Sequence, residues 1–170
     1  MKALKKPDRD HQYKMKGLEP QRPDVLGAWV TTALILGIAS MLHLADRPFI
    51  LFSLGGSCVI LFGASDSPMA QPRSLIGGHF VGAATGLIFF HLLGDSIAVM
   101  STAVATVLCL MIITKTVHSP AGATPLIAIS THASWSFMVD PVAIGVVTLL
   151  VGKISYQRLW LKQKYPDSWL

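Results

Sequence analysis

The chain has 170 residues, of which 52% are hydrophobic and 14% are charged, and its formal net charge is +5. This composition is too apolar and too sparsely charged for a soluble globule of this length, so it indicates an integral membrane protein. Basic residues gather in the first 24 and the last 18 positions, on both sides of the apolar runs. We interpret them as topology signals at a lipid bilayer, and we expect no nucleic-acid partner.

The chain opens with a basic tail, residues 1–24, which precedes an apolar run from Val25 to Leu44. About twenty residues at 1.5 Å each match the roughly 30 Å hydrocarbon core of a bilayer, so this run predicts a first spanning helix. Asp46-Arg47-Pro48 is expected to form an outer turn. Phe49 to Ala64 then predicts a shorter second helix.

A polar stretch, Ser65 to Arg73, interrupts the apolar pattern before a third predicted helix, Ser74 to Gly94. This helix carries Gly78, Gly82 and Gly86 at intervals of four. Such a ridge of small residues lets a neighbouring helix backbone approach closely, and it is also compatible with homo-oligomers. We therefore expect this helix to lie at the centre of the packing.

Ile97 to Val117 predicts a fourth helix, and the stretch from His118 to Pro125 then breaks the apolar pattern a second time. Prolines lack a backbone donor and disfavour helix in the preceding residue, so one helix cannot pass straight through this stretch. Thr124 is expected to cap a new helix, with Pro125 as its first residue.

The fifth predicted helix, Pro125 to Val139, is only modestly apolar, so it should face protein or a wet cavity. Asp140-Pro141 is the expected outer turn before the last helix, Val142 to Trp160. The result is an all-α membrane bundle of about six crossings, or five if the fifth segment re-enters. The membrane domain covers residues 25–161, and residues 162–170 form a tail.

Basic residues before the first span and after the last place both termini in the cytoplasm, which requires an even number of crossings. The two polar breaks then lie on the cytoplasmic side. The expected location is the inner, or plasma, membrane of a bacterium.

Features of the two polar breaks recur at nearly the same interval. Cys58 and Cys109 are 51 positions apart, and Ser67-Pro68 and Ser119-Pro120 are 52 apart. This spacing predicts an internal repeat of two units, each a helix, a broken loop and a helix, as is common in transporters. The alternative is that prolines end helices in many unrelated places. The units cover residues 49–94 and 97–139.

The helix starts that follow the two breaks, near Arg73 and Thr124, would converge on one cavity if the repeat is real. Helix N-termini carry unpaired N–H groups and a positive dipole end, so such a cavity suits an anion. Arg73 would add a guanidinium charge, or it is only a topology anchor. His118 could bind the anion or carry a proton, or it simply caps a helix.

The remaining candidate ligands offer neutral hydrogen bonds, although the same groups are equally suited to cap helices. They are Ser67, Gln71, His79, Ser119, Gly122 and Thr124. His79 could line the same cavity, or it could be a buried histidine bonded across helices. The histidine and cysteine spacing fits no zinc site, and no arrangement of nucleophile, base and orienting group is visible. We therefore expect no metal, no cofactor and no enzyme activity.

Two stretches and the chain end carry a family resemblance. Phe62 to Arg73, with Gly77-Gly78-His79 beyond it, resembles the signature of the HPP family of integral membrane proteins. His118 to Ile127 is similar to the motif that names the family, although His118-Ser119-Pro120 stands where the family has His-Pro-Pro. Tyr165-Pro166 with Trp169 resembles the end of the family's domain.

The resemblance implies a compact helical membrane domain, and members from cyanobacteria and plastids are associated with nitrite transport. Our leading hypothesis is therefore transmembrane transport of a small inorganic monovalent anion, with nitrite favoured by the resemblance. The alternative is a structural or regulatory membrane module that docks a partner and transports nothing.

Overall fold

The computed structural model describes residues 25–27, 29, 30, 33, 37 and 49–166. The predicted basic tail, most of the first span and the turn at 46–48 lie outside the described residues. Within the described part every element is helical, which confirms the all-α prediction. Helices α4 and α5 and the helical run from Trp135 to Trp160 are each long and apolar enough to cross a membrane.

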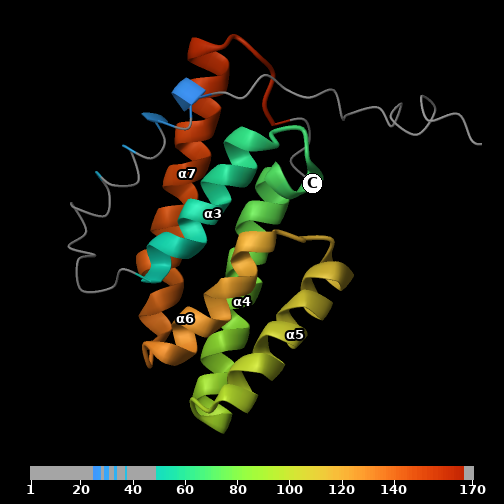
Figure 1. Ribbon diagram of the computed structural model, residues 1–170, viewed down its shortest axis with the longest axis vertical. Helices are drawn as coiled ribbons and strands as arrows, with labels where there is room; N and C mark the ends of the chain where they lie inside the picture. The colour runs from blue at the N-terminus through green and yellow to red at the C-terminus, as the bar shows by residue number, and fades with distance from the viewer. Residues whose placement is uncertain (1–24, 28, 31–32, 34–36, 38–48, 167–170) are drawn as a thin grey trace, which may run out of the picture.

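The elements follow one another along the chain in a bundle of helices (Figure 1). The α-helices are α3 (Phe49–Gly63), α4 (Pro72–Leu93), α5 (Ile97–Thr114), α6 (Thr124–Ser130) and α7 (Ile144–Ser155). Three short 3₁₀-helices are η2 (Pro68–Ala70), η3 (Ser119–Ala123) and η4 (Trp135–Met138). Two π-helical turns flank α7, namely η5 (Val139–Ala143) and η6 (Tyr156–Trp160).

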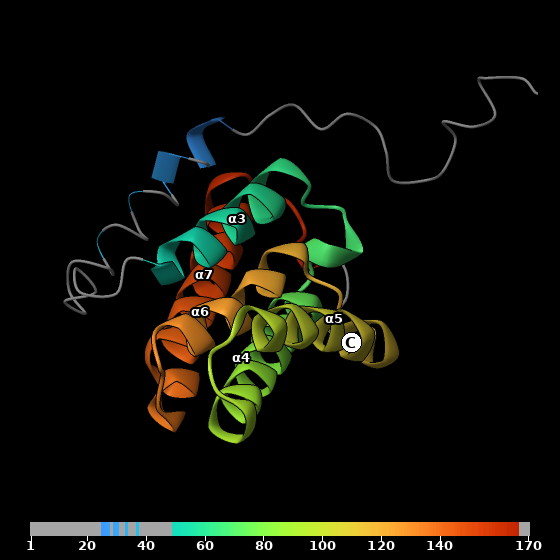
Figure 2. The ribbon, with the colours of Figure 1, turned by 60° about the horizontal axis from the view of Figure 1, so that its bottom comes forward.

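Helix α4 lies at the centre, as predicted, and packs against α5, α6, α7 and η3 (Figure 2). Its ends follow from its sequence. Pro72 occupies the first helical position, where its missing N–H costs nothing, and Gly94 ends the helix with a positive φ of 84°. Ser96 then begins α5 by accepting a hydrogen bond from the Val99 backbone N–H.

Helix α5 ends at Thr114, three residues before the predicted end at Val117. Lys115 adopts the left-handed conformation, with φ 56°. Its N–H donates to the Ile112 carbonyl, and the next N–H donates to the Met111 carbonyl, which is the Schellman arrangement. The residues from 116 onward are therefore released from α5 and continue beside α4.

Residues 116–132, hereafter the broken segment, lie alongside the glycine ridge of α4. A Cβ atom built on Gly78 would lie 2.8 Å from the His118 Cβ, and one built on Gly86 would lie 2.6 Å from the Pro125 Cα. Residue numbers increase in the same direction along α4 and along the segment that faces it, so the broken segment runs parallel to α4. The predicted glycine ridge therefore receives another part of the same chain.

The fifth crossing differs from the single helix predicted over 125–139. Helix α6 has seven residues, or about 10 Å at 1.5 Å per residue, and that alone is too short to cross a bilayer. The η3 turn and the extended residues before it supply the rest of the path along α4. Both views place α6 beside α4 (Figures 1 and 2). The path along α4 is therefore made by a discontinuous segment and not by a single helix.

Helix α6 ends in a second Schellman arrangement, with His132 at φ 50°. The His132 N–H donates to the Ile129 carbonyl, and the Ala133 N–H donates to the Ala128 carbonyl. The turn between α6 and the last helical run therefore lies at residues 131–134, and the prediction that placed this turn at Asp140-Pro141 is wrong. That dipeptide instead forms a kink within the last helical run.

The apolar core is shared by α3, α4 and the helical run 135–160. Its most buried side chains include Leu61, Leu75, Leu87, Val142, Val146 and Leu149. Helix α5 contributes less, and its outer face exposes apolar side chains such as Ile112 and Ile113. Apolar residues on the outside are expected where lipid is the solvent.

The chain folds back after η6, so part of the predicted C-terminal tail packs against the domain. Tyr165 is 2% exposed, and its hydroxyl donates to the Ala70 carbonyl at 2.6 Å. Arg158 Nε donates to the Tyr165 carbonyl at 2.9 Å. These contacts tie the end of the described chain to the first polar break.

Candidate functional site

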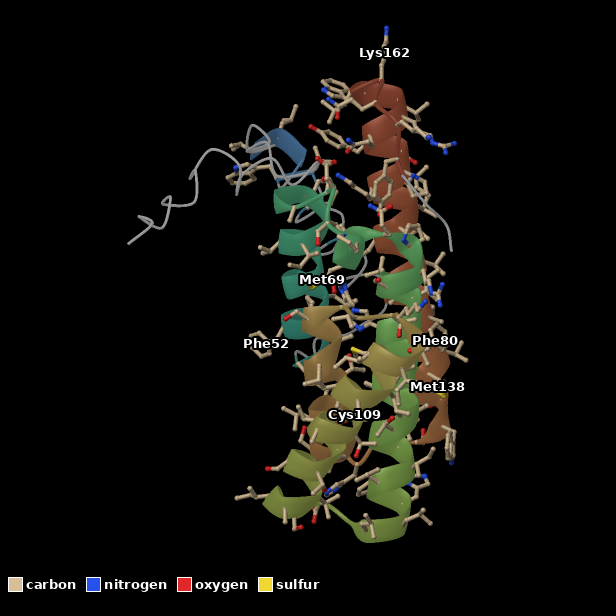
Figure 3. The ribbon with its side chains drawn as sticks, turned by 90° about the vertical axis from the view of Figure 1, so that its right-hand side faces the viewer. Phe52, Met69, Phe80, Cys109, Met138 and Lys162 are labelled. Carbon is tan, nitrogen blue, oxygen red and sulfur yellow. The ribbon has the colours of Figure 1, made fainter. Side chains whose placement is uncertain are left out.

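The two polar breaks meet through His118. Its Nδ1 lies 2.8 Å from the carbonyl oxygen of Met69 in the first break. Met69 lies near the middle of the long axis of the molecule, between Lys162 at one end and the α5 residue Cys109 (Figure 3). The two breaks are therefore in direct contact, and that contact is a histidine ring on a backbone carbonyl.

His118 belongs to a buried network with His79 of α4 and Ser57 of α3. Both histidines are 0% exposed, and their ring centroids lie 5.2 Å apart. The Ser57 hydroxyl oxygen lies 2.9 Å from the Nε2 atom of each ring. One hydroxyl therefore joins a histidine of the central helix to a histidine of the broken segment.

Thr124 and Ser53 complete this arrangement on the other side of His79. Thr124 Oγ1 lies 3.1 Å from His79 Nδ1 and 3.2 Å from Ser53 Oγ, and Ser53 Oγ donates to the Pro120 carbonyl at 2.8 Å. The five side chains form what we call the histidine–serine network. Its members are Ser53, Ser57, His79, His118 and Thr124.

Thr124 does not cap a helix as predicted. Its backbone is helical, with φ −58° and ψ −42°, and Ala123 stands at the cap position without a side-chain bond. The Thr124 side chain is fully buried and faces His79. The expected capping role of Thr124 is therefore wrong, and its place among the candidate ligands stays a prediction.

The glycine ridge explains how these groups come so close. A Cβ on Gly82 would lie 2.8 Å from the Ala121 carbonyl oxygen and 3.1 Å from the Thr124 Cβ. Larger residues there would push the broken segment away from α4. Because the broken segment lies this close to α4, Thr124 is within hydrogen-bond distance of His79.

The Met69 carbonyl settles which nitrogen of His118 carries hydrogen. A carbonyl oxygen can only accept, so Nδ1 of His118 donates to it. In a neutral ring the Nε2 atom then holds the lone pair and accepts from Ser57. The backbone of the first break therefore selects the tautomer of a residue in the second.

Arg73 lies outside the network. Its exposed side chain donates from Nη2 to the Thr114 carbonyl at 2.8 Å, which caps the end of α5. Ser119 is also exposed, and Gly122 has open space where a Cβ would stand. The structure thus separates these three predicted ligands from the two histidines.

Gln71 and Ser67 shape the first break. Gln71 Nε2 donates to the Ser65 carbonyl at 3.2 Å, and Ser67 Oγ accepts from the Met69 N–H at 3.2 Å. Both contacts are local, and they hold the turn that presents the Met69 carbonyl to His118. Of the two functions that we weighed for these side chains, helix capping is visible for Ser67, which caps η2, whereas the Gln71 side chain makes no cap hydrogen bond at the start of α4.

The sequence analysis missed Ser53 and Ser57. They lie four positions apart on an apolar helix, and therefore on one face. Beside them, a Cβ on Gly56 would lie 3.1 Å from the Pro120 Cβ. Polar residues aligned on one face of an apolar helix signal a polar contact inside the protein, and that signal was available.

A second buried polar group lies near the first break. Lys153 is 1% exposed, and its Nζ donates at 2.7 Å to both Ser65 Oγ and Gln157 Oε1. The same ammonium lies 4.5 Å from the centroid of the Phe62 ring and 5.3 Å from that of Tyr165. Lys153 is therefore a buried contact between Ser65 of the first break and Tyr165 near the end of the described chain.

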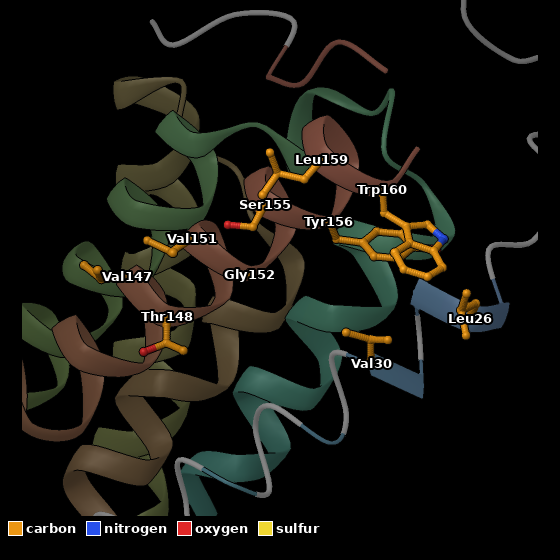
Figure 4. A pocket seen from close by; sticks show the side chains of 10 residues that line it. All are labelled: Leu26, Val30, Val147, Thr148, Val151, Gly152, Ser155, Tyr156, Leu159 and Trp160. Carbon is orange, nitrogen blue, oxygen red and sulfur yellow. The ribbon is translucent and has the colours of Figure 1, made fainter. Parts of the chain in front are cut away.

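An apolar groove lies away from the network, on the outer face of α7 and η6 (Figure 4). It is lined by Leu26, Val30, Val147, Thr148, Val151, Gly152, Ser155, Tyr156, Leu159 and Trp160. Its surface is almost entirely apolar, so it does not suit a small anion. Within the described residues, no group of three His, Cys, Asp or Glu side chains could hold a metal ion.

Comparison with known proteins extends these observations. A family model described as the HPP transmembrane region matches residues 20–166. A transmembrane protein of Dictyostelium discoideum is 34% identical over 92% of this chain, and a second from the same organism is 28% identical over 88%. The chain spans 56% and 57% of the length of these relatives. No solved structure matches it.

Proposed function

Because the chain belongs to the HPP family of integral membrane proteins, we propose that it transports a small inorganic monovalent anion across the membrane. Nitrite is the favoured substrate, from the resemblance of the two polar breaks to family members associated with nitrite. Three earlier expectations stay predictions: that the protein lies in the bacterial inner membrane, that both termini are cytoplasmic, and that the chain contains an internal repeat. The relatives come from a eukaryote.

The observation that carries the proposal is the histidine–serine network at the discontinuity of the fifth crossing. Polar and ionisable groups inside a membrane protein are costly, and they mark ion and proton pathways. Irregular backbone at membrane depth is tolerated where it is buried in protein or lines a cavity. Broken helices at the binding site are a recurrent feature of transporters.

The network offers the chemistry that a small oxyanion needs. The hydroxyls of Ser53, Ser57 and Thr124 can rotate their hydrogens toward a bound anion without moving the backbone. Arg73 contributes positive charge nearer the surface, since only one of its five donors is used on Thr114. Ser67, Gln71, Ser119 and Gly122 belong to the same proposed path through the two breaks.

One observation favours the second candidate, a structural or regulatory module that docks a partner. Arg73, Gln71 and Ser67 all hold the breaks in place through contacts within the chain. In this alternative the network stabilises the discontinuous crossing and nothing passes through it. The small-residue ridge of α4 is already occupied by the broken segment, so a second copy would dock elsewhere.

Uptake by purified protein in liposomes tests the proposal, with nitrite, nitrate, formate, chloride and bicarbonate offered in turn. We expect saturable uptake of nitrite, lowered at least tenfold by Thr124→Val, which keeps the side-chain volume and removes the hydroxyl. Thr102→Val on the exposed face of α5 is the matched control and should leave uptake unchanged. Protein that is folded but transports none of these anions would contradict the proposal and favour the module.

In the same uptake assay, Arg73→Ala distinguishes binding of the anion from its passage through the network. We expect a several-fold rise in the concentration that gives half-maximal uptake, with little change in the maximal rate, because the guanidinium attracts the anion from outside the network. Arg73→Lys should restore part of the affinity. Uptake that is unchanged at every nitrite concentration would limit Arg73 to its capping contact with Thr114.

A further inference from the structure

The histidine–serine network contains fewer hydrogens than hydrogen-bond contacts. Seven contacts join its five side chains to one another and to three backbone carbonyls, and each needs one hydrogen. Three hydroxyls and two neutral imidazole rings supply five hydrogens. Two contacts are therefore without a hydrogen while both rings are neutral.

Ser57 is where the shortage is concentrated. Its oxygen lies 3.0 Å from the Ser53 carbonyl and 2.9 Å from Nε2 of each histidine, yet it has one hydrogen. With His118 neutral, that hydrogen is donated either to the Ser53 carbonyl or to His118 Nε2, so one of these two contacts is without a hydrogen. In the tautomer of His79 that carries its hydrogen on Nε2, this N–H donates to Ser57 and Thr124 donates to His79 Nδ1.

One added proton fills this gap without moving a heavy atom. Placed on His118 Nε2, it makes His118 a donor to Ser57 and leaves its Nδ1 bond to the Met69 carbonyl intact. Ser57 then turns its own hydrogen to the Ser53 carbonyl and accepts from both rings, which uses its full capacity. The contact still without a hydrogen is then the longest in the network, at 3.2 Å between Ser53 and Thr124.

The surroundings of the network decide when such a proton can enter. Helix α3 presents two serines, α4 presents His79, the broken segment presents His118 and Thr124, and the first break presents a carbonyl. Among the described residues, no carboxylate, ammonium or guanidinium hydrogen-bonds to either ring. A positive charge alone in this buried site is costly, whereas an anion beside it would offset the cost.

We infer that the network binds the anion and a proton together, with His118 as the proton carrier and Ser57 as the hydroxyl that turns between the two states. This inference rests on the proposed function and deepens it. Binding forms one N–H bond at His118 Nε2, and release on the other side of the membrane breaks it. One negative and one positive charge move together, so transport is electrically neutral and is driven by a pH gradient.

The test uses full-length protein in liposomes, with initial rates of nitrite uptake measured under two separate driving forces. The leak of nitrous acid through protein-free liposomes is subtracted. We expect an inward proton gradient of one pH unit to raise the rate several-fold and an imposed membrane potential to leave it unchanged. Uptake that follows the potential and ignores the pH gradient overturns this inference and leaves anion transport standing. Absence of uptake overturns both.

His118→Asn is the sharpest variant. Its side-chain N–H can still donate to the Met69 carbonyl, but no titratable Nε2 is left. We expect the stimulation by the pH gradient to be lost while some uptake remains. His132→Gln, on the exposed turn, is the matched control and should keep the stimulation. Equal stimulation of His118→Asn and wild type contradicts the inference.

A measurement on the wild-type protein covers the case in which His118→Asn does not fold. Nitrogen NMR of histidine-labelled protein distinguishes the neutral Nδ1–H ring from the doubly protonated ring. We expect added nitrite to convert His118 from the first to the second at constant pH. A His118 ring that stays neutral when nitrite is bound to saturation would show that the anion binds without its proton.

Discussion

The broken segment carries a histidine near each end, of which His118 is buried and His132 is exposed. His118 is fully buried, donates to a backbone carbonyl and shares Ser57 with His79. His132 stands on the turn after α6, stacked on Phe90 with ring centroids 5.1 Å apart. Its Nε2 donates to Asp95 Oδ2 at 2.7 Å, and both side chains are more than half exposed.

The difference shows that burial and partner, more than residue type, set what a histidine does. At this turn water screens the charges, and the hydrogen bond from His132 holds the pKa of the Asp95 carboxyl below its ordinary value. At the buried end His118 is shielded from bulk solvent, so leaving one of its polar groups without a partner is costly. A change at His118 should therefore cost far more than a change at His132.

The largest contrast is expected between His118→Ala and His132→Ala. Removing His118 leaves the Met69 carbonyl and Ser57 without their partner and opens a cavity, which should lower the unfolding free energy by about 3 to 4 kcal/mol. Removing His132 from the surface should change it by about 0.5 kcal/mol or less. Unfolding of the purified protein in mixed detergent micelles measures both, and equal losses would erase the distinction between the two ends.

A somewhat smaller loss is expected for Gly86→Ala. The new Cβ would lie 2.6 Å from the Pro125 Cα, so the broken segment must shift away from α4, at a cost of about 1 to 3 kcal/mol. Gly55→Ala is the control, because a Cβ there meets nothing within 4 Å and helix propensity favours alanine. If the two variants have the same unfolding free energy, the glycine ridge does not determine how closely the broken segment packs against α4.

Thr124→Val tests the inner half of the network with almost no change in shape. It leaves His79 Nδ1 without the hydroxyl at 3.1 Å and should destabilise the protein by about 1 to 2 kcal/mol. Combining it with Ser53→Ala, its neighbour at 3.2 Å, should give less than the sum of the two single losses. Strict additivity would show that Thr124 and Ser53 do not act as a unit.

The smallest effect belongs to Asp95→Asn at the exposed end, and it has a definite dependence on pH. Since folding lowers the pKa of Asp95, the carboxylate adds stability above its unfolded pKa and loses that contribution as the pH falls through the folded value. The variant should therefore be slightly less stable than wild type at pH 6, and the difference should be smaller at pH 3, below the unfolded pKa of about 3.9. Thermal unfolding at the two pH values measures this, and a difference that grows in acid would reverse the sign.

Much of the fold could be predicted from the sequence. The apolar runs defined α3 and α4 closely, and the glycines at intervals of four correctly indicated a close helix contact. Two helix ends were missed for one physical reason. Both use a left-handed residue, which the sequence rules associate with glycine, yet the residues here are Lys115 and His132.

The site was predicted only in part. His79, His118 and Thr124 were predicted as candidate ligands, and their side chains do come together, although they meet through direct hydrogen bonds and not around two helix starts. Ser57, which joins them, was missed because a serine in an apolar helix can satisfy itself on the preceding turn. Its register against α4 and the broken segment is a tertiary fact that local patterns do not contain.

The first break is finished by residues that lie far along the chain. The Met69 carbonyl receives its bond from His118, 49 positions later, and the Ala70 carbonyl receives its bond from Tyr165, 95 positions later. A ribosome that adds about 5 to 20 residues per second needs roughly 5 to 20 s to make the chain from Ala70 to Tyr165. Helices α3 and α4 are therefore synthesised well before their connecting turn acquires its partners, and the last of these bonds to the first break can form only after Tyr165 has been made.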